Sequence, residues 1–121
     1  MIVRRTLFLC SLFFIFLNFT VAERPMEIED LFRIKRVSEP QLSPDGKWIA
    51  FVVTAVDKPA NKSNSDIYII PSTGGDIRQL TNTPGRDAHP RWSPDSKLIA
   101  FESTRSGDSQ IWLIDLRSGT Q

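Results

Sequence analysis

The chain is poor in the side chains that most often build covalent crosslinks, metal centres and proton-transfer sites. Its 121 residues include one cysteine and one histidine. Cys10 lies in an apolar N-terminal run, so the rest of the chain contains no thiol and the sequence excludes a disulfide framework. An excess of one charge sign is also missing, because 15 basic and 14 acidic residues leave a formal net charge of +1. This balance excludes the dense basic patch that nucleic acids or anionic membrane surfaces require.

Candidate functional residues are correspondingly few. The single histidine, His89, precedes Pro90 at the expected start of a strand, which favours a loop or packing role over that of a general base. Gly74-Gly75 neither follows the spacing of a phosphate-binding loop nor opens a helix, so we interpret it as a turn. No calcium-loop spacing relates the scattered aspartates Asp45, Asp95 and Asp108. The sequence therefore predicts no catalytic, cofactor-binding or metal-binding residue in this chain.

The first 22 residues have the order of features that defines a secretory signal peptide. Arg4-Arg5 supplies the charged region, and the apolar run Leu7–Leu17 has 11 residues, fewer than the roughly 20 that span a bilayer. Thr20-Val21-Ala22 then supplies the small residues that a signal peptidase requires. We expect cleavage after Ala22, an exported product that begins at Glu23, and membrane contact only during export. An uncleaved membrane anchor is the alternative.

An internal repeat dominates the rest of the chain. Residues 40–51 read Pro-Gln-Leu-Ser-Pro-Asp-Gly-Lys-Trp-Ile-Ala-Phe, and residues 90–101 read Pro-Arg-Trp-Ser-Pro-Asp-Ser-Lys-Leu-Ile-Ala-Phe, at an offset of 50. Residues 66–70 match residues 110–114 at an offset of 44, so the first copy has six additional residues between its two halves. These fall within 56–65, whose composition predicts a loop, where repeat proteins usually accept insertions.

Each copy is expected to form short antiparallel strands, because β-branched and aromatic residues cluster between turn-forming residues. In Ser43-Pro44-Asp45-Gly46, proline and aspartate suit the central turn positions and glycine accepts a positive φ at the fourth, which indicates a hairpin. The second copy has Ser96 in place of Gly46, so its turn either relaxes or carries a strain of roughly 1 kcal/mol. Strands are predicted near 39–42, 48–54, 66–70 and 77–80 in the first copy, and near 89–92, 98–102 and 110–114 in the second.

Four antiparallel strands in a repeat of about 40 to 50 residues are typical of a β-propeller blade. Because a propeller closes with roughly 4 to 8 blades, the expected fold is an all-β, incomplete β-propeller, with one full blade and most of a second. The predicted units are a signal peptide (1–22), a leader with a short helix (23–38), blade 1 (39–87) and a truncated blade 2 (88–121). Recurring aromatic residues are expected to pack between neighbouring blades, with ligand stacking as the alternative: Trp48, Phe51, Tyr68, Trp92, Phe101 and Trp112.

The sequence of the repeat also resembles a repeat of known families. Ser-Pro-Asp-Gly-Lys-Trp-Ile-Ala-Phe at 43–51, followed by Asp-Ile-Tyr-Ile-Ile at 66–70 and by Gly74-Gly75, resembles the propeller repeat shared by TolB-like proteins and the prolyl oligopeptidase family. The resemblance covers residues 40–121. It implies a propeller, and it leaves open which of the two families the chain is closer to.

The leader is the segment that separates the two families. Residues 26–40 resemble the start of exported acylaminoacyl-peptidase-like and dipeptidyl-peptidase-like members, and Ile28, Leu31 and Phe32 have the spacing of a short amphipathic helix. This resemblance implies the N-terminal propeller part of a secreted serine peptidase, whose propeller restricts access of peptide substrates to a downstream α/β-hydrolase domain. That family carries its nucleophile in a Gly-x-Ser-x-Gly elbow of the downstream domain, and this chain contains no such elbow. The alternative is a non-enzymatic TolB-like periplasmic propeller that binds a protein partner.

Overall fold

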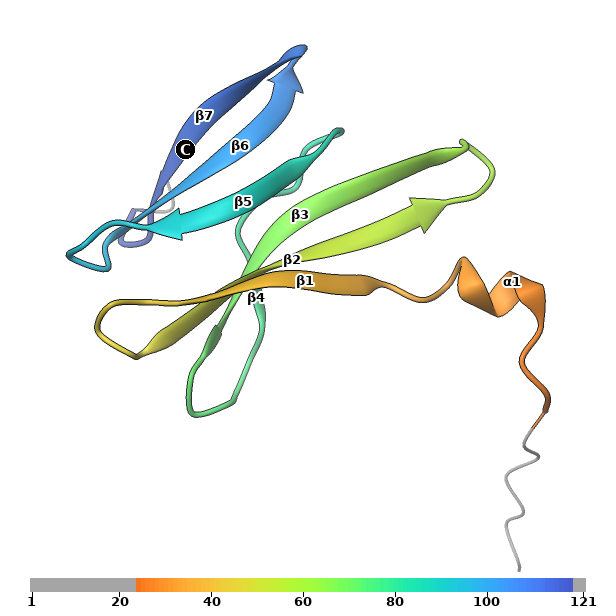
Figure 1. Ribbon diagram of the computed structural model, residues 1–121, viewed down its shortest axis with the longest axis horizontal. Helices are drawn as coiled ribbons and strands as arrows, with labels where there is room; N and C mark the ends of the chain where they lie inside the picture. Colours follow the sequence, from red (N-terminus) through yellow and green to blue (C-terminus); the bar gives the residue numbers. More distant parts are fainter. Residues whose placement is uncertain (1–23, 119–121) are drawn as a thin grey trace, which may run out of the picture.

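The computed structural model describes residues 24–118, which form one short helix and two antiparallel β-sheets (Figure 1). The helix α1 spans Ile28–Leu31. The first sheet has the order β1-β2-β3-β4, and these strands span Arg36–Leu42, Trp48–Asp57, Lys62–Pro71 and Arg78–Gln79. The second sheet has the order β5-β6-β7, with strands Asp87–Trp92, Leu98–Ser106 and Asp108–Asp115.

This arrangement confirms the predicted fold class, an all-β propeller fragment with one four-stranded blade and three strands of a second. Every strand pairs with its neighbour in the sequence, so each blade is an antiparallel meander. Most of the strands extend beyond their predicted ranges. Strand β1 begins at Arg36 rather than near residue 39, β5 begins at Asp87 rather than near residue 89, and β6 continues to Ser106 rather than ending near residue 102. The predicted signal peptide lies outside the described residues.

The first turn of each blade is built by a serine and an aspartate, as the repeat predicted. Ser43 Oγ accepts a hydrogen bond from the backbone amide of Trp48 at 2.9 Å and donates one to Asp45 Oδ1 at 2.6 Å. The same bonds recur in blade 2 around Ser93 and Asp95, with the same two lengths. Each aspartate also accepts a hydrogen bond from the backbone amide two residues on, so the bonds that close each turn are local ones.

Residues with positive φ occupy equivalent places in the two blades. Ser96 has a φ of +59°, close to the +72° of Gly46, so the second turn does not relax and keeps the left-handed conformation. Glu39 and His89, which are also 50 residues apart, both have a φ of +55°. Each lies at an irregularity in the strand pairing, where a β-bulge bends the first strand of its blade.

The loop predicted for residues 56–65 was wrong for most of that segment. Strand β2 continues to Asp57, β3 begins at its pairing partner Lys62, and only residues 58–61 connect them. Compared with β6 and β7, β2 is one residue longer and β3 two residues longer, and the connection is three residues longer, so the six additional residues are shared between the strands and the connection. Asn61 accepts the positive φ of +49° that this tight connection requires, which is tolerated by asparagine better than by most residues.

The apolar core lies between the two blades. In one cluster, Ala50 and Ile69 of blade 1 pack with Ile99 of blade 2. In the other, Ile67 of blade 1 packs with Phe101 and Ile114 of blade 2, and all six side chains are at most 1% exposed. Burial of apolar surface between the sheets is therefore what holds the blades together.

The recurring aromatic residues divide into two groups. Trp48 and Trp92 pack against the first of these clusters, and Trp112 packs against the second. Phe51 and Tyr68, paired residues of β2 and β3, instead stack on one another with ring centroids 6.0 Å apart. The expectation of packing between blades therefore fits the tryptophans better than it fits this pair.

Candidate functional site at the leader rim

One end of the two blades gathers the segments that differ most between the repeats (Figure 1). We call it the leader rim and define it as α1, the β2–β3 connection (58–61), the crossover between the sheets (80–86) and the β6–β7 turn at Gly107. The antiparallel strand order places the two tight turns after β1 and β3 at the opposite rim. The meander thus separates a variable rim from a rim of tight turns.

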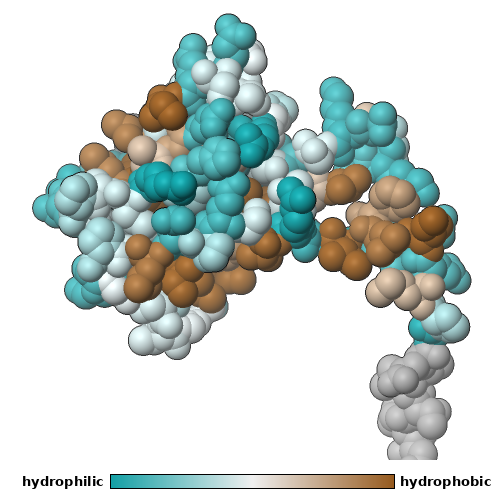
Figure 2. Space-filling model, viewed as in Figure 1, coloured by the Kyte–Doolittle hydropathy of each residue, from teal (hydrophilic) through white to brown (hydrophobic). Residues whose placement is uncertain are grey.

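The leader folds back onto the long β2–β3 hairpin through one lysine. Lys58 Nζ lies 4.4 Å from the ring centroid of Phe32 and 3.8 Å from Glu29 Oε1. These exposed contacts are individually weak, and they link the leader to the tip of the hairpin. The apolar side chains of the leader gather on its surface and stay exposed, as Figure 2 shows: Met26 (71%), Ile28 (67%), Leu31 (54%), Phe32 (37%) and Ile34 (52%).

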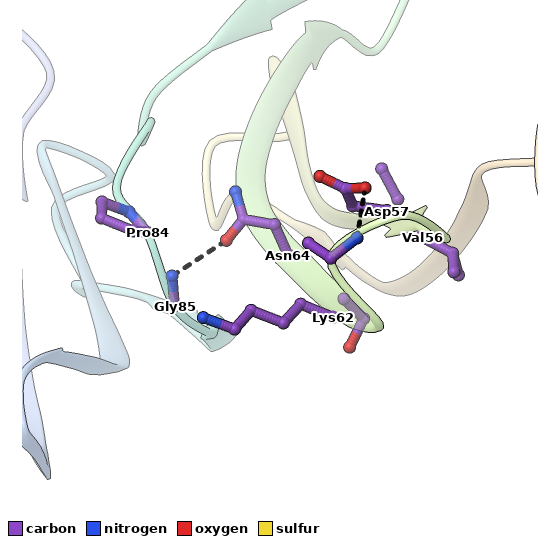
Figure 3. Close-up of a pocket in the computed structure, with 9 residues that line it drawn as sticks. Val56, Asp57, Lys62, Asn64, Pro84 and Gly85 are labelled. Atoms are coloured by element: carbon purple, nitrogen blue, oxygen red, sulfur yellow. Dashed lines mark hydrogen bonds between the residues drawn. The ribbon is translucent and has the colours of Figure 1, made fainter.

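A hollow of about 340 Å³ lies between the hairpin tip and the crossover (Figure 3). Its apolar lining includes Ala55, Val56, Ala60 and Pro84, and its charged lining comes from Asp57 and Lys62. The backbone amide of Gly85 donates a hydrogen bond to Asn64 Oδ1 at 3.1 Å and so forms one wall. Gly85 has a φ of +135°, and a Cβ there would lie 2.9 Å from Thr104 Oγ1. Only glycine fits this wall.

A buried polar network lies at the point where the crossover enters blade 2. Asp87, whose side chain is 1% exposed, accepts hydrogen bonds from Ser103 Oγ, from Thr83 Oγ1 at 3.1 Å and from the Arg105 guanidinium at 3.1 Å. That guanidinium also lies over the ring of Trp112, 4.7 Å from its centroid. A carboxylate with a guanidinium and two hydroxyls as partners is well satisfied, which allows its burial.

Sequence analysis missed this network, although a signal was present. At the offset of 50, Val37, Val53 and Ala55 of the first copy become Asp87, Ser103 and Arg105 of the second. Three apolar positions thus change together to groups that can bind one another. Comparing the two copies position by position, and looking for polar residues that replace apolar ones together, would have revealed the network.

A second buried carboxyl belongs to Asp66 in β3. Asp66 accepts hydrogen bonds from Asn64 Nδ2 at 2.9 Å and from Thr81 Oγ1 at 3.3 Å. Burial raises the pKa of this carboxyl above its ordinary value, and the neighbouring Asp87 carboxylate adds to the rise. Thr81 Oγ1 in turn accepts from the backbone amide of Ile67 at 2.9 Å, so the crossover is tied to β3.

His89, the one candidate for proton transfer, bridges the two blades. Its backbone amide donates to Glu39 Oε2 at 2.7 Å, and its ring Nδ1 lies 3.2 Å from the same oxygen. Its Nε2 lies 3.3 Å from the Arg86 guanidinium and 3.7 Å from Glu102 Oε2. The partners of His89 are therefore two carboxylates and a guanidinium, and through them the ring contacts both blades.

The other residues considered in the sequence lie in turns or at the start of a strand. Asp45 and Asp95 belong to the tight turns, where a serine hydroxyl and a backbone amide hold the pKa of each carboxyl below its ordinary value. Asp108 begins β7 at the β6–β7 turn. Gly74-Gly75 lies between β3 and β4, with positive φ at both residues, as a turn requires.

Residues 24–118 contain no group of three or more histidine, cysteine or acidic side chains arranged to hold a metal ion. No helix in this part of the chain is long and apolar enough to cross a membrane. The expectation that the chain carries no catalytic, cofactor-binding or metal-binding residue stays a prediction. What the leader rim can do is bind another surface through its exposed apolar leader and its hollow.

Comparison with known proteins extends this picture. The chain is 34% identical over 92 residues to the uncharacterized peptidase YuxL of Bacillus subtilis, which covers 75% of the chain and 14% of that protein. It is 36% identical over 78 residues to dipeptidyl-peptidase 5 of Porphyromonas gingivalis, 64% of the chain and 11% of that protein. It is also 43% identical over 56 residues to the Tol-Pal system protein TolB of Bordetella pertussis, 46% of the chain and 13% of that protein. The chain thus spans a small part of the length of each relative.

Solved structures give the same result for the fold. An acylaminoacyl peptidase in complex with Z-Gly-Gly-Phe-chloromethyl ketone matches 75% of the chain and 14% of its own length, with a TM-score of 0.64 and 26% identity. The β-propeller domain of the trilobed protease from Pyrococcus furiosus matches 71% of the chain and 26% of its own length, with a TM-score of 0.57 and 30% identity. The family model of the TolB beta propeller domain matches residues 31–121. The chain belongs to the TolB beta propeller domain family.

Proposed function

We propose that the chain is the non-catalytic, N-terminal propeller part of an exported serine peptidase of the prolyl oligopeptidase family. The observation that carries the proposal is the structural likeness to an acylaminoacyl peptidase, with a TM-score of 0.64 over 75% of the chain. The likeness to TolB from Acinetobacter baumannii is weaker, with a TM-score of 0.53 over 67%. The identities with YuxL and dipeptidyl-peptidase 5 support the same choice.

In this proposal the chain has four parts: a signal peptide (1–22), a leader (23–38), blade 1 and an incomplete blade 2. The completed propeller restricts the access of peptide substrates to an α/β-hydrolase domain that follows it. In this proposal the leader rim faces the hydrolase domain, and the exposed apolar leader and the hollow support that choice. An exposed apolar group of this size needs a covering partner.

The second candidate function is a periplasmic TolB-like propeller that binds a protein partner. The observation in its favour is that the TolB homolog of Chlorobium luteolum is 32% identical over 87 residues, or 72% of the chain. In this case the leader rim would bind another protein rather than a hydrolase domain of the same chain.

A serine-directed fluorophosphonate probe distinguishes the two functions. The probe is applied to the 121-residue chain and to the product of the same reading frame extended beyond Gln121, which we call the parent. The peptidase proposal expects the parent to be labelled at one serine, in a Gly-x-Ser-x-Gly elbow followed by Asp and His, and the 121-residue chain to stay unlabelled.

The control is the parent with the elbow serine replaced by alanine, which should lose the label without loss of fold. A parent that has further Ser-Pro-Asp-Gly repeats, no elbow and no label would establish the TolB-like function instead. Labelling of the 121-residue chain would contradict both, because it would place a nucleophile within the propeller.

A further inference from the structure

The hollow at the leader rim depends on the longer hairpin of blade 1, which blade 2 lacks. It lies between the ends of β2 and β3, the connection that joins them, and Pro84-Gly85 of the crossover (Figure 3). In blade 2 only Gly107 separates β6 from β7, so no equivalent connection is present there. Residues inserted into one copy of a repeat often contribute to the binding face of a repeat protein. The hollow is therefore a candidate binding site rather than part of the packing that the blades share.

The walls of the hollow are held in place by the fold itself. The backbone amide of Gly85 donates to Asn64 Oδ1 at 3.1 Å, and its carbonyl accepts from the amide of Ser65 at 3.3 Å. Both bonds tie the crossover to β3. On the hairpin side, Asp57 Oδ1 accepts from the backbone amide of Ala60 at 3.1 Å and closes the connection. The volume of about 340 Å³ lies at the lower end of the roughly 300 to 1,000 Å³ of small-ligand sites, so a molecule of dipeptide size fits.

Two opposite charges line this hollow without neutralising each other. Asp57 and Lys62 form the last residue pair of the hairpin, a position at which opposite charges usually attract. Within residues 24–118, however, the Lys62 ammonium makes no hydrogen bond or ion pair, and Asp57 Oδ2 makes none either. Figure 3 shows the Lys62 side chain running toward Gly85 rather than toward Asp57. The hollow therefore offers a free cation and a free carboxylate oxygen to a ligand.

We propose that the hollow binds a short zwitterionic peptide of dipeptide size, with its terminal carboxylate at Lys62 and its terminal ammonium at Asp57. The small apolar lining suits side chains such as that of alanine. A ligand with only an anionic group would also meet the Asp57 carboxylate, and one with only a cationic group would meet the Lys62 ammonium. A zwitterion instead pairs with both through charge-assisted hydrogen bonds. The inference goes beyond the proposed function, because it places a peptide-binding site in the propeller itself and requires no hydrolase domain.

Three forms of one dipeptide test the recognition of both charged ends. The probe is L-alanyl-L-alanine, its N-acetyl form lacks the ammonium, and its amide form lacks the carboxylate. Each is titrated into the ¹⁵N-labelled 121-residue chain, and the backbone amides of Gly85 and Asn64 are followed by NMR. The unblocked peptide should show saturable binding. Each blocked form should bind at least about tenfold more weakly, because it leaves one charge of the hollow without a partner.

Variants of the two charged residues test the direction in which the peptide lies. Lys62→Met should weaken binding of the unblocked peptide to the level of the amide form, and it should not change binding of the amide form itself. Asp57→Asn keeps an oxygen that can accept from Ala60, and it should weaken the unblocked peptide to the level of the N-acetyl form. Lys97→Met is the matched control, because Lys97 is an exposed lysine in the first turn of blade 2, and it should leave binding unchanged. All three substituted residues are exposed, so urea unfolding should show an unchanged midpoint.

Equal binding of the three peptides would overturn the proposal, because the hollow would then recognise apolar surface alone. Absence of saturable binding below about 10 mM peptide would also overturn it. Equilibrium dialysis with the parent, its elbow serine replaced by alanine, covers the case in which the 121-residue chain does not stay folded. There Lys62→Met must lower binding of the unblocked peptide, and unchanged binding would count against the proposal. The fluorophosphonate label does not depend on Lys62 and the dialysis does not depend on hydrolysis, so failure of this inference is distinguishable from failure of the proposed function.

Discussion

The backbone amide of Asp45 donates a hydrogen bond to Ser96 Oγ at 3.1 Å and joins the first turns of the two blades. Ser96 occupies the position that glycine holds in blade 1, and it keeps the left-handed conformation there. A glycine has no side chain to accept this bond. The strained serine of the second turn is therefore also a contact between the blades.

Substitutions of Ser96 should separate the cost of its backbone strain from the contribution of its hydrogen bond to Asp45. Ser96→Ala keeps the positive φ and loses the acceptor, so it should lower the free energy of unfolding by about 1 kcal/mol. Ser96→Gly loses the same acceptor but relieves roughly 1 kcal/mol of backbone strain, so it should be nearly neutral. Urea unfolding of residues 23–121, followed by tryptophan fluorescence, measures both.

Gly46→Ala is the matched control in blade 1. A Cβ at Gly46 would meet nothing within 4 Å, so its cost of about 1 kcal/mol should arise from the φ of +72° alone. A Ser96→Gly variant clearly less stable than Ser96→Ala would contradict this account, because it would mean that the left-handed conformation carries no strain.

The buried network of blade 2 predicts strong non-additivity. Arg105→Ala removes the guanidinium from the buried Asp87 carboxylate, and we expect it to cost about 3 to 5 kcal/mol, enough to unfold a marginally stable fragment. The variant Asp87→Val, Ser103→Val, Arg105→Ala copies the residues of the first blade. It should cost much less than Arg105→Ala alone, because no buried charge is left without its partner.

Circular dichroism and urea unfolding of the four variants, the triple and its three single changes, check this prediction. Ser103→Val alone should have an intermediate cost, since it removes one neutral donor to Asp87. If the triple variant costs as much as the sum of its single changes, the residues act independently and the network does not explain the burial of Asp87.

The sequence predicted the turns well because they depend on interactions between residues that are close in the sequence. The turn around Ser43 and Asp45 depends on hydrogen bonds between residues at most five apart, which composition alone reveals. The network around Asp87 depends on Ser103 and Arg105, which are 16 and 18 residues away on another strand, and no local pattern indicates them. The repeat carries that information only when its two copies are compared position by position.

The prediction of a loop between β2 and β3 was wrong for a different physical reason. Residues such as Asp57 and Asn61 favour turns, so the whole segment 56–65 resembled a loop. Pairing across the hairpin decided otherwise for 56–57 and 62–65, because these residues extend two strands that run side by side. Intrinsic strand propensity is weak compared with the pairing that a neighbouring strand provides.

The raised pKa of Asp66 predicts a stability that falls as pH rises. A carboxyl whose pKa is higher in the folded state stabilises the fold fully below its unfolded pKa, near 3.9, and this contribution is lost as pH rises through the folded pKa. Asp66→Asn should therefore gain stability relative to the unmodified chain between about pH 4 and neutrality. Urea unfolding at pH 3, 5 and 7 measures the difference.

Asp45→Asn provides a control of opposite sign. The pKa of Asp45 is lowered by the Ser43 hydroxyl and the Lys47 amide, so its charge stabilises the fold above the unfolded pKa and this is lost as pH falls through the folded value. Asp45→Asn should thus lose stability at neutral pH and match the unmodified chain in strong acid. Parallel pH profiles for the two variants would contradict the assignment.

The last prediction concerns the N-terminus. Removal of residues 1–22 takes away Arg4-Arg5 and leaves 13 basic against 14 acidic residues, a formal net charge of −1. The exported protein should therefore begin at Glu23 and run as a slightly acidic species in isoelectric focusing. Intact mass spectrometry of the protein recovered outside the cytoplasm determines the terminus directly.

Two substitutions at Ala22 make the test specific. Ala22→Arg puts a large charged side chain where the peptidase requires a small one, and it should block cleavage and leave the precursor at the membrane. Ala22→Ser keeps a small residue and should be processed normally. If the unmodified chain itself is recovered from the membrane with Met1 intact, the apolar run is an anchor. The two blades would then be held at the membrane surface by residues 1–22, because the leader connects that run directly to β1.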